Sequence, residues 1–148
     1  MEPSFRAAGP SDADALVEMM RDFNAHERIA FDEREVRAVL AQLFANDSLG
    51  LACLMLLGAE VAGYVVITFG FSIEFRGRDA FIDELFVKDE FRGRGLGGAA
   101  LGFAAGVCRD RGVRALHLEV ERENTRAQSV YRRAGFADHD RYLLTKWV

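Results

Sequence analysis

The sequence predicts one α/β domain built on a mixed, mostly antiparallel sheet that contains a single parallel strand pair and is flanked by helices. Three observations predict this class: two amphipathic helical stretches near the start, three successive apolar runs of strand length, and a glycine-rich turn that opens a helix between two strands. That helix is a right-handed crossover, so the strands it joins run parallel. With 148 residues and no linker, the chain is expected to be one domain over residues 1–148.

The first third of the chain predicts a short strand and two helices. The strand covers about residues 5–7, and Ser11 is the expected N-cap of a helix from about residue 12. A second helix is expected over about residues 32–44. Each helix has an apolar stripe at helical spacing, formed by Leu16, Met19, Met20 and Phe23 in the first and by Val36, Val39, Leu40 and Leu43 in the second.

The middle of the chain predicts three consecutive antiparallel strands. They cover about residues 49–57, 61–69 and 80–87. A short hairpin turn that begins at Gly58 joins the first two, and the charged loop 72–79 joins the second pair.

The last third predicts two further helices and two further strands. A helix over about residues 96–111 is followed by a strand over 115–120, a short helix over 125–134 and a last strand over 141–147. The complete order is β-α-α-β-β-β-α-β-α-β.

One helix face in this region is almost without side chains. Gly98, Gly102 and Gly106 recur four residues apart, and each interior glycine costs a helix about 1 kcal/mol relative to alanine. We therefore expect something to pack closely against this face, either the sheet or a ligand, with the sheet favoured.

Composition and charge exclude several classes of function. The formal net charge of −4 argues against a general nucleic-acid binder. No apolar stretch is long enough to span a membrane and the start lacks a signal-peptide pattern, so a cytoplasmic protein with no membrane partner is expected. Cys53 and Cys108 lie in apolar contexts and are expected to be buried, reduced thiols. His26, His117 and His139 are widely spaced, which predicts no metal site.

The segment Arg92-Gly93-Arg94-Gly95-Leu96-Gly97-Gly98 predicts an anion site at the start of the helix over residues 96–111. Unpaired N–H groups at a helix N-terminus attract phosphate, and glycine lets the main chain approach a ligand. A turn without a ligand is the alternative. The spacing G-x-G-x-x-G also occurs here, but three antiparallel strands and a charged segment precede it, which argues against a dinucleotide fold. No Gly-Lys-Ser/Thr follows, so a P-loop is excluded.

Two segments together resemble the signatures of the GNAT (GCN5-related) N-acetyltransferase superfamily. Arg92, Gly95 and Gly97 fit the acyl-CoA signature Arg/Gln-x-x-Gly-x-Gly/Ala after an apolar strand. The second signature, Asn-x-x-Ala-x-x-x-Tyr-x-x-x-Gly-Phe, is matched by Asn124, Ala127, Tyr131, Gly135 and Phe136. The element order agrees as well, so the resemblance covers essentially the whole chain and implies the GNAT fold.

The resemblance implies an acyltransferase that moves the acetyl group of acetyl-CoA directly to a primary amine, without a covalent enzyme intermediate. Tyr131 is implied as the acid that protonates the CoA sulfur, and Asn124 would bond the pantetheine arm. Backbone groups would make most of the remaining contacts. The residues expected to bind the cofactor are Phe86, Val87, Arg92, Gly93, Arg94, Gly95, Leu96, Gly97, Asn124, Ala127 and Tyr131.

Candidate bases lie just before the apolar run 85–87. Asp83 and Glu84 are adjacent in a strand, so they point to opposite faces unless the strand has a bulge. The resemblance favours Glu84 slightly over Asp83, with His117, Glu119 or a water molecule as alternatives. Either carboxylate could instead bind the amine or a neighbouring arginine.

The acceptor is expected to contact two loops. His26, Glu27 and Phe31 lie between the first two helices, and Phe71 and Glu74 follow the strand over residues 61–69. Aromatic rings and carboxylates suit a small cationic amine that is polyamine-, aminoglycoside- or amino-acid-like, although the same rings could serve as core or dimer contacts. A protein N-terminal or lysine acetyltransferase and a non-catalytic acyl-CoA sensor are the alternatives, and a homodimer is compatible with the sequence.

Overall fold

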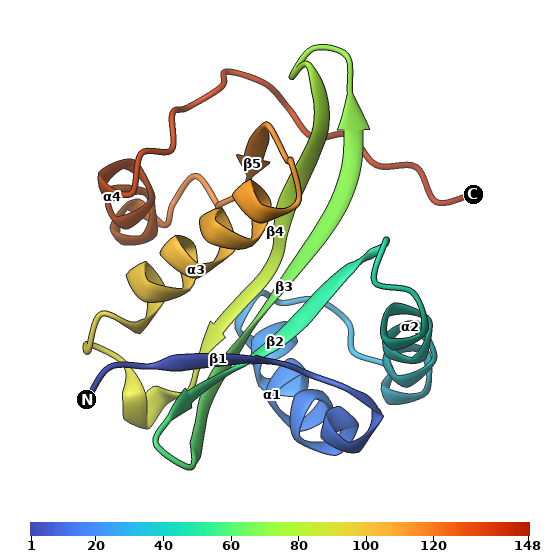
Figure 1. Ribbon diagram of the computed structural model, residues 1–148, viewed down its shortest axis with the longest axis vertical. Coiled ribbons are helices and arrows are strands. Elements are labelled where there is room, and N and C mark those ends of the chain that lie inside the picture. The colour runs from blue at the N-terminus through green and yellow to red at the C-terminus, as the bar shows by residue number, and fades with distance from the viewer.

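Five strands form one mixed sheet in the order β1–β2–β3–β4–β5 in the computed structural model, which describes residues 1–148 (Figure 1). Neighbouring strands are antiparallel except for β4 and β5, which are parallel. The predicted fold class is confirmed. The strands are β1 (Ser4–Ala7), β2 (Gly50–Leu57), β3 (Glu60–Ser72), β4 (Gly77–Val87) and β5 (Ala115–His117).

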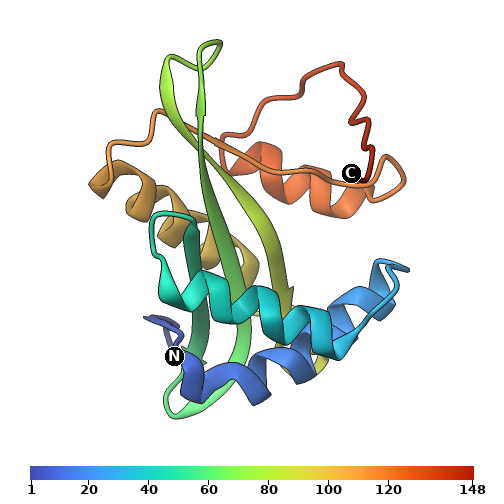
Figure 2. The same cartoon turned by 90° about the vertical axis from the view of Figure 1, so that its right-hand side faces the viewer.

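Helices cover both faces of the sheet. Figures 1 and 2 show α1 and α2 on one side and α3 and α4 on the other, with α3 as the crossover between β4 and β5. The helices are α1 (Ala13–His26), α2 (Glu33–Ala45), α3 (Leu96–Asp110) and α4 (Thr125–Arg133), with short 3-10 turns η1 (Pro10–Asp12) and η2 (Asp89–Phe91). No helix has the length and apolar character that crossing a membrane requires.

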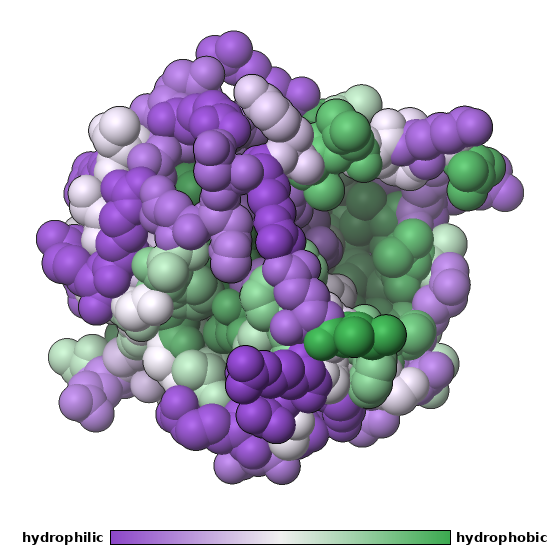
Figure 3. All heavy atoms as spheres, turned by 90° about the horizontal axis from the view of Figure 1, so that it is seen from above, coloured by the Kyte–Doolittle hydropathy of each residue, from purple (hydrophilic) through white to green (hydrophobic).

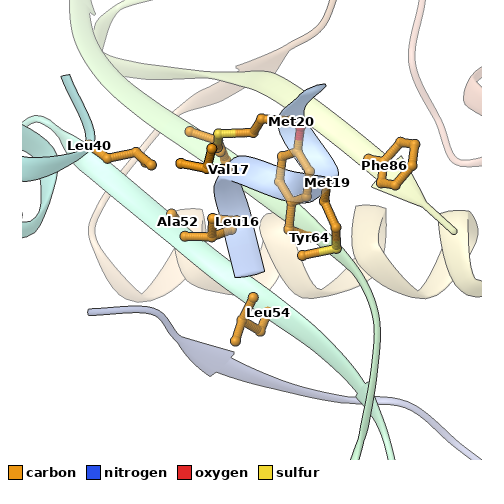
Figure 4. Close-up of a cluster of buried hydrophobic side chains, with 10 residues drawn as sticks. Leu16, Val17, Met19, Met20, Leu40, Ala52, Leu54, Tyr64 and Phe86 are labelled. Atoms are coloured by element: carbon orange, nitrogen blue, oxygen red, sulfur yellow. The ribbon is translucent and has the colours of Figure 1, made fainter. Parts of the chain in front are cut away.

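Each face of the sheet has its own hydrophobic core. On the α1 side the fully buried ring of Tyr64 lies among apolar side chains from α1, α2 and the strands (Figure 4). Its centroid is 5.9 Å from that of Phe86 and 6.5 Å from that of Phe23, distances at which aromatic pairs stabilise a core. On the α3 side, Cys53 and Cys108 belong to one cluster and are free and buried, as expected, and burial raises the pKa of both thiols.

The first helix begins differently from the expectation. Ser11 lies inside η1, and Asp12 is the residue that precedes α1. Arg6 donates to both oxygens of Asp12 at 3.0 Å, and the N–H of Gly9 donates to Asp12 Oδ2 at 3.0 Å. These bonds fix the turn against β1, so the helix starts one residue later than a Ser11 cap would allow.

The expected last strand over residues 141–147 is wrong. After α4 the chain has no regular structure and passes the end of the β3–β4 hairpin (Figure 1). Side chains alone attach it there: Arg141 donates to Glu74 at 2.9 Å, and His139 meets the ring of Phe75 edge-on. A strand needs a backbone partner as well as residues that favour extended structure, and no strand adjoins this segment. Its exposed apolar residues are Tyr142, Leu143, Leu144, Trp147 and Val148.

The favoured expectation that the sheet packs on the glycine face of α3 is wrong, and a ligand on this face stays the other prediction. A Cβ atom built at Gly98, Gly102 or Gly106 would meet nothing within 4 Å outside the helix. The helix packs on the sheet through the opposite face instead, where residues such as Leu101 and Ala104 are buried. The glycines therefore face away from the core.

Candidate active site

The sheet opens along one edge of β4. Strand β5 pairs with β4 only over Asp79–Phe81, so the edge of β4 from residue 82 to residue 87 has no strand partner. Lys88 N–H donates to Ala62 O in register, and the antiparallel alternation therefore turns the backbone of Phe86 toward β3 and that of Val87 toward the open edge. The carbonyl of Val87 accepts from Arg92 Nε at 3.0 Å, which leaves its N–H facing the opening.

A cradle of backbone N–H groups follows β4. Gly93 and Gly95 both have a φ of 76°, a left-handed conformation that glycine adopts without strain. The N–H groups of residues 93–98 donate to no acceptor within the protein, and α3 begins among them. Aligned free amides at a helix N-terminus are a binding site for a phosphate-like anion. The cradle therefore fits the pyrophosphate of a nucleotide-derived cofactor.

The two arginines of the turn support the loop with their side chains. Arg92 reaches Val87 O and pairs with Asp89 at 3.1 Å. Arg94 donates to Glu90 O at 3.3 Å, and its guanidinium lies over the ring of Phe91. Their side chains fix the approach to the cradle. The backbone N–H of Arg94 belongs to it, whereas that of Arg92 donates to Asp89 O at 3.2 Å.

A β-bulge brings the two acidic residues of β4 to the same face. Glu84 lies opposite Val66 and Ile82 lies opposite Ile67, so Asp83 has no partner on β3. Ile82 packs on the α3 side, and the extra residue after it turns Asp83 and Glu84 together toward the α1 side. We expected Asp83 and Glu84 on opposite faces only if the strand had no bulge. The structure has a bulge, so both residues lie on the same face.

Glu84 is in the environment of a proton acceptor. Burial and the nearby charge of Asp83 raise the pKa of Glu84 to about 7, while a hydrogen bond from Tyr64 opposes this rise. That bond joins Tyr64 Oη to Glu84 Oε1 at 2.8 Å. The side chain of Asp83 reaches solvent, but its carboxyl group is partly buried. This partial burial raises the pKa of Asp83 as well. A base that titrates near neutral pH can take a proton from an amine and release it again.

Tyr131 of α4 has the properties of a proton donor. The side chain is half-buried and packs against the core on the α3 side, with the ring of Phe136 at 6.3 Å. Burial first, and then the negative charge of Glu27 from the α1–α2 loop, raise the pKa of Tyr131. The phenol is therefore protonated at neutral pH, and Glu27 is near enough to act on it.

The side chain of Asn124 has a structural role that does not depend on a ligand. Its Oδ1 accepts the N–H of Ala127 at 3.1 Å and so caps the N-terminus of α4. The cap fixes the helix that carries Tyr131. The side-chain NH₂ group of Asn124 makes no hydrogen bond within the protein.

The expected acceptor residues separate into two groups. His26 lines a hollow of about 680 Å³ that reaches Phe86, and Phe31 lies under the guanidinium of Arg21 at 4.7 Å. Together with Glu27 they belong to the α1–α2 end. Phe71 and Glu74 lie instead toward the tip of the β3–β4 hairpin, where Phe71 is 75% exposed. The structure therefore does not bring the five residues into one contact group.

The face at the hairpin end is hollowed. Viewed from above, hydrophobic residues gather in a depression whose surroundings are largely hydrophilic (Figure 3). Phe81 on the α1 side of β4 and Ile73 in the hairpin are among the exposed large apolar residues. An acceptor with apolar segments would find contact surface at this end.

Two polar pairs near the site were missed by sequence reasoning. Tyr64 was included only in a strand, since nothing in the sequence shows which residue its hydroxyl meets. His117 Nε2 lies 3.2 Å from Asp79 Oδ2, at an angle that makes no hydrogen bond, between the rings of Phe75 and Phe81. β5 ends at His117, so Glu119 does not share a strand face with it as expected.

Comparisons with known proteins agree with this geometry. Residues 15–136 match the family described as "Acetyltransferase (GNAT) family". A thialysine N-epsilon-acetyltransferase of Bos taurus is 35% identical over 81 residues, which are 55% of this chain and about half (47%) of that protein. The crystal structure of an integron cassette protein from the mobile metagenome of Cole Harbour Salt Marsh is 36% identical, with a TM-score of 0.85 over 97% of this chain and 90% of that one.

A fold likeness extends to more distant proteins. The structure of a predicted acetyltransferase with acetyl-CoA from Clostridium acetobutylicum has a TM-score of 0.82 at 19% identity and covers 98% of this chain and 96% of that one. The family match extends over most of the chain, through both signatures and the open sheet edge between them. The resemblance seen in the two motifs is therefore confirmed, and the chain belongs to the GNAT family of acetyl-CoA-dependent N-acetyltransferases.

Proposed function

We propose that the protein acetylates the primary amine of a small cationic molecule by direct transfer from acetyl-CoA. The observation that carries this proposal is the carboxylate of Glu84, which has a pKa of about 7 and lies on a strand whose edge is open. A structural carboxylate has no need of a pKa near neutrality, whereas a base for an ammonium group does.

Residues on both sides of the opening would hold the cofactor. The amides of residues 93–98 suit its pyrophosphate, and the N–H of Val87 and the NH₂ group of Asn124 are free to bond the pantetheine arm. Ala127, in the first turn of α4, has a side chain small enough for that arm to approach the helix. When bound, acetyl-CoA supplies the activated thioester.

Glu84 and Tyr131 then transfer protons during the reaction. Glu84 accepts the proton of the substrate ammonium, so that the amine lone pair forms the new C–N bond as the C–S bond breaks. Tyr131 donates its proton to the departing sulfur. As the amide forms, its nitrogen loses a second proton, which reaches the Tyr131 phenolate through water. Glu84 releases the first proton to solvent, so one proton leaves per turnover and the cycle balances.

Negative charge near the opening favours a cationic acceptor. Glu27 acts on Tyr131 from the α1–α2 loop, and Asp83 shares its face of β4 with Glu84. The bovine relative is named as an acetyltransferase of the ε-nitrogen of thialysine, which is an amine acceptor. Because that match spans half of the relative, it supports the class of acceptor and no single compound.

The free amides of the cradle lead to a prediction about the binding of acetyl-CoA. Gly95→Ala is expected to raise the Kd for acetyl-CoA about tenfold, because a left-handed φ costs a residue with a Cβ about 1–2 kcal/mol and misaligns the amides. Isothermal titration calorimetry measures the change. Gly102→Ala is the matched control on the same helix: its added Cβ meets open space, so Kd should stay the same. Equal affinity in both variants would remove the cradle from the site.

An amine panel tests the function itself. Acetyl-CoA turnover is measured with polyamines, aminoglycosides, amino acids with amine side chains, and peptides with free N-termini or lysine. Turnover concentrated in the small cationic amines is the expected result. Preference for peptides would favour a protein acetyltransferase. Tight CoA binding without turnover of any amine would identify an acyl-CoA sensor and contradict the proposal.

A further inference from the structure

Tyr64 is fully buried, unlike Tyr131 and Tyr142, and the reaction above gives it no part. Phenylalanine would fill the same apolar space without a hydroxyl group to satisfy. A buried hydroxyl needs a hydrogen-bond partner, and that of Tyr64 has one, the carboxylate of Glu84 at 2.8 Å. This hydroxyl, buried in the core on the α1 side, is therefore directed at the candidate base.

The scaffold holds this hydroxyl firmly. Tyr64 lies opposite Phe86 on β4, and Glu84 lies opposite Val66, two residues farther along β3 on the same face. The contact is thus a diagonal one between neighbouring strands. Phe23 and Phe86 pack against the ring, which stands among buried side chains of α1 (Figure 4). The register that the bulge at Asp83 creates sets the position of Glu84 relative to the phenol.

We propose that Tyr64 is a positioning residue for the base: its hydroxyl holds one oxygen of Glu84 and leaves the other free to take the proton of the amine. The inference rests on the proposed function, because it needs Glu84 to be the base. Tyr64 itself touches neither the amine nor the cofactor.

Few titratable groups act on the pKa of Glu84, so the effect of removing one of them can be measured. Tyr64 on β3 and Asp83 on β4 are the titratable groups that act on its pKa. The buried residues that α1 and α2 turn into the core on this side are uncharged: Leu16, Val17, Met19, Met20, Asn24 and Leu40. His117 on β5, Tyr131 on α4 and Glu27 in the α1–α2 loop are not among the groups that shift the pKa of Glu84. Because the phenol donates to the charged form, its removal must raise the pKa of Glu84.

The experiment compares Tyr64→Phe with the wild type in two independent readouts. A ¹³C NMR titration of glutamate-labelled protein, with the Glu84 signal assigned by its loss in Glu84→Gln, should show a higher carboxyl pKa in Tyr64→Phe. The pH profile of kcat/KM should shift its acidic limb to higher pH, with a loss of about tenfold at pH 6 and a much smaller one on the alkaline plateau. A purely structural role would lower activity without moving the limb.

Controls separate the two proposals. Tyr142→Phe removes a hydroxyl from the exposed C-terminal segment and should leave both readouts unchanged. If Tyr64→Phe does not fold, 3-fluorotyrosine at position 64, a stronger donor, should move the pKa of Glu84 downward. An unmoved NMR pKa overturns the positioning role. A moved NMR pKa with no matching shift of the kinetic limb shows that the bond exists but that Glu84 is not the base, which overturns the proposed mechanism instead.

Discussion

Tyr131→Phe is expected to lower kcat about 100-fold, because proton transfer from a positioned acid contributes at least that factor. The ring remains, so its packing against Phe136 and the core on the α3 side should survive. The Kd for acetyl-CoA should therefore stay within about twofold. Steady-state release of CoA measures kcat, and calorimetry measures Kd.

Comparing the change in kcat with the change in Kd for acetyl-CoA decides the role of Tyr131. A fall in kcat without weaker binding indicates a proton donor that acts in the transition state. An unchanged kcat would mean that the thiolate leaves without help from Tyr131. Weaker binding with an unchanged kcat would give the hydroxyl a role in holding the cofactor, because the ring is the same in both proteins.

Glu84→Gln is expected to lower kcat/KM about 100-fold at pH 8 and to abolish the acidic limb of the pH profile. In the wild type, burial raises the pKa of Glu84 to about 7, and the base works only when it is deprotonated. Activity should thus rise with pH through about 7 and level off above it. Glutamine keeps the shape of the side chain and can accept a hydrogen bond from Tyr64, so the fold should be preserved.

Asp83→Asn is the matched control for this result. The negative charge of Asp83 contributes to the raised pKa of Glu84. Its loss should move the acidic limb to lower pH while the limb itself remains. If Asp83→Asn abolished the limb and Glu84→Gln did not, the two carboxylates would exchange roles.

Local patterns in the sequence predicted most of the architecture. Helical stripes and strand runs depend on side chains near one another in the chain, and these elements were found within a few residues of their expected bounds. The glycine turn and the segment 124–136 were recognisable because backbone conformation and capping fix their residue types. The residues proposed to hold the cofactor are thus largely visible in the sequence.

What the sequence could not show depends on pairing between strands. The bulge at Asp83 exists only relative to the register of β3, and the bond between Tyr64 and Glu84 joins residues 20 positions apart. The C-terminal segment fails for the same reason: it contains residues that favour strands, but the short β5 ends at His117 and offers no neighbour. The support of the proposed base could therefore be found only in three dimensions.

Asp83 is not needed for packing the two cores, but it adds a carboxylate at the opening. If Asp83 is left out, the side chains of residues 81–86 alternate without interruption between the two cores, with Ile82 and Leu85 on one side and Phe86 on the other. Asp83 is therefore a one-residue insertion in an otherwise regular ribbon, and no apolar contact depends on it. A shorter β4 could build the same two cores, but it would carry one carboxylate at the opening in place of two.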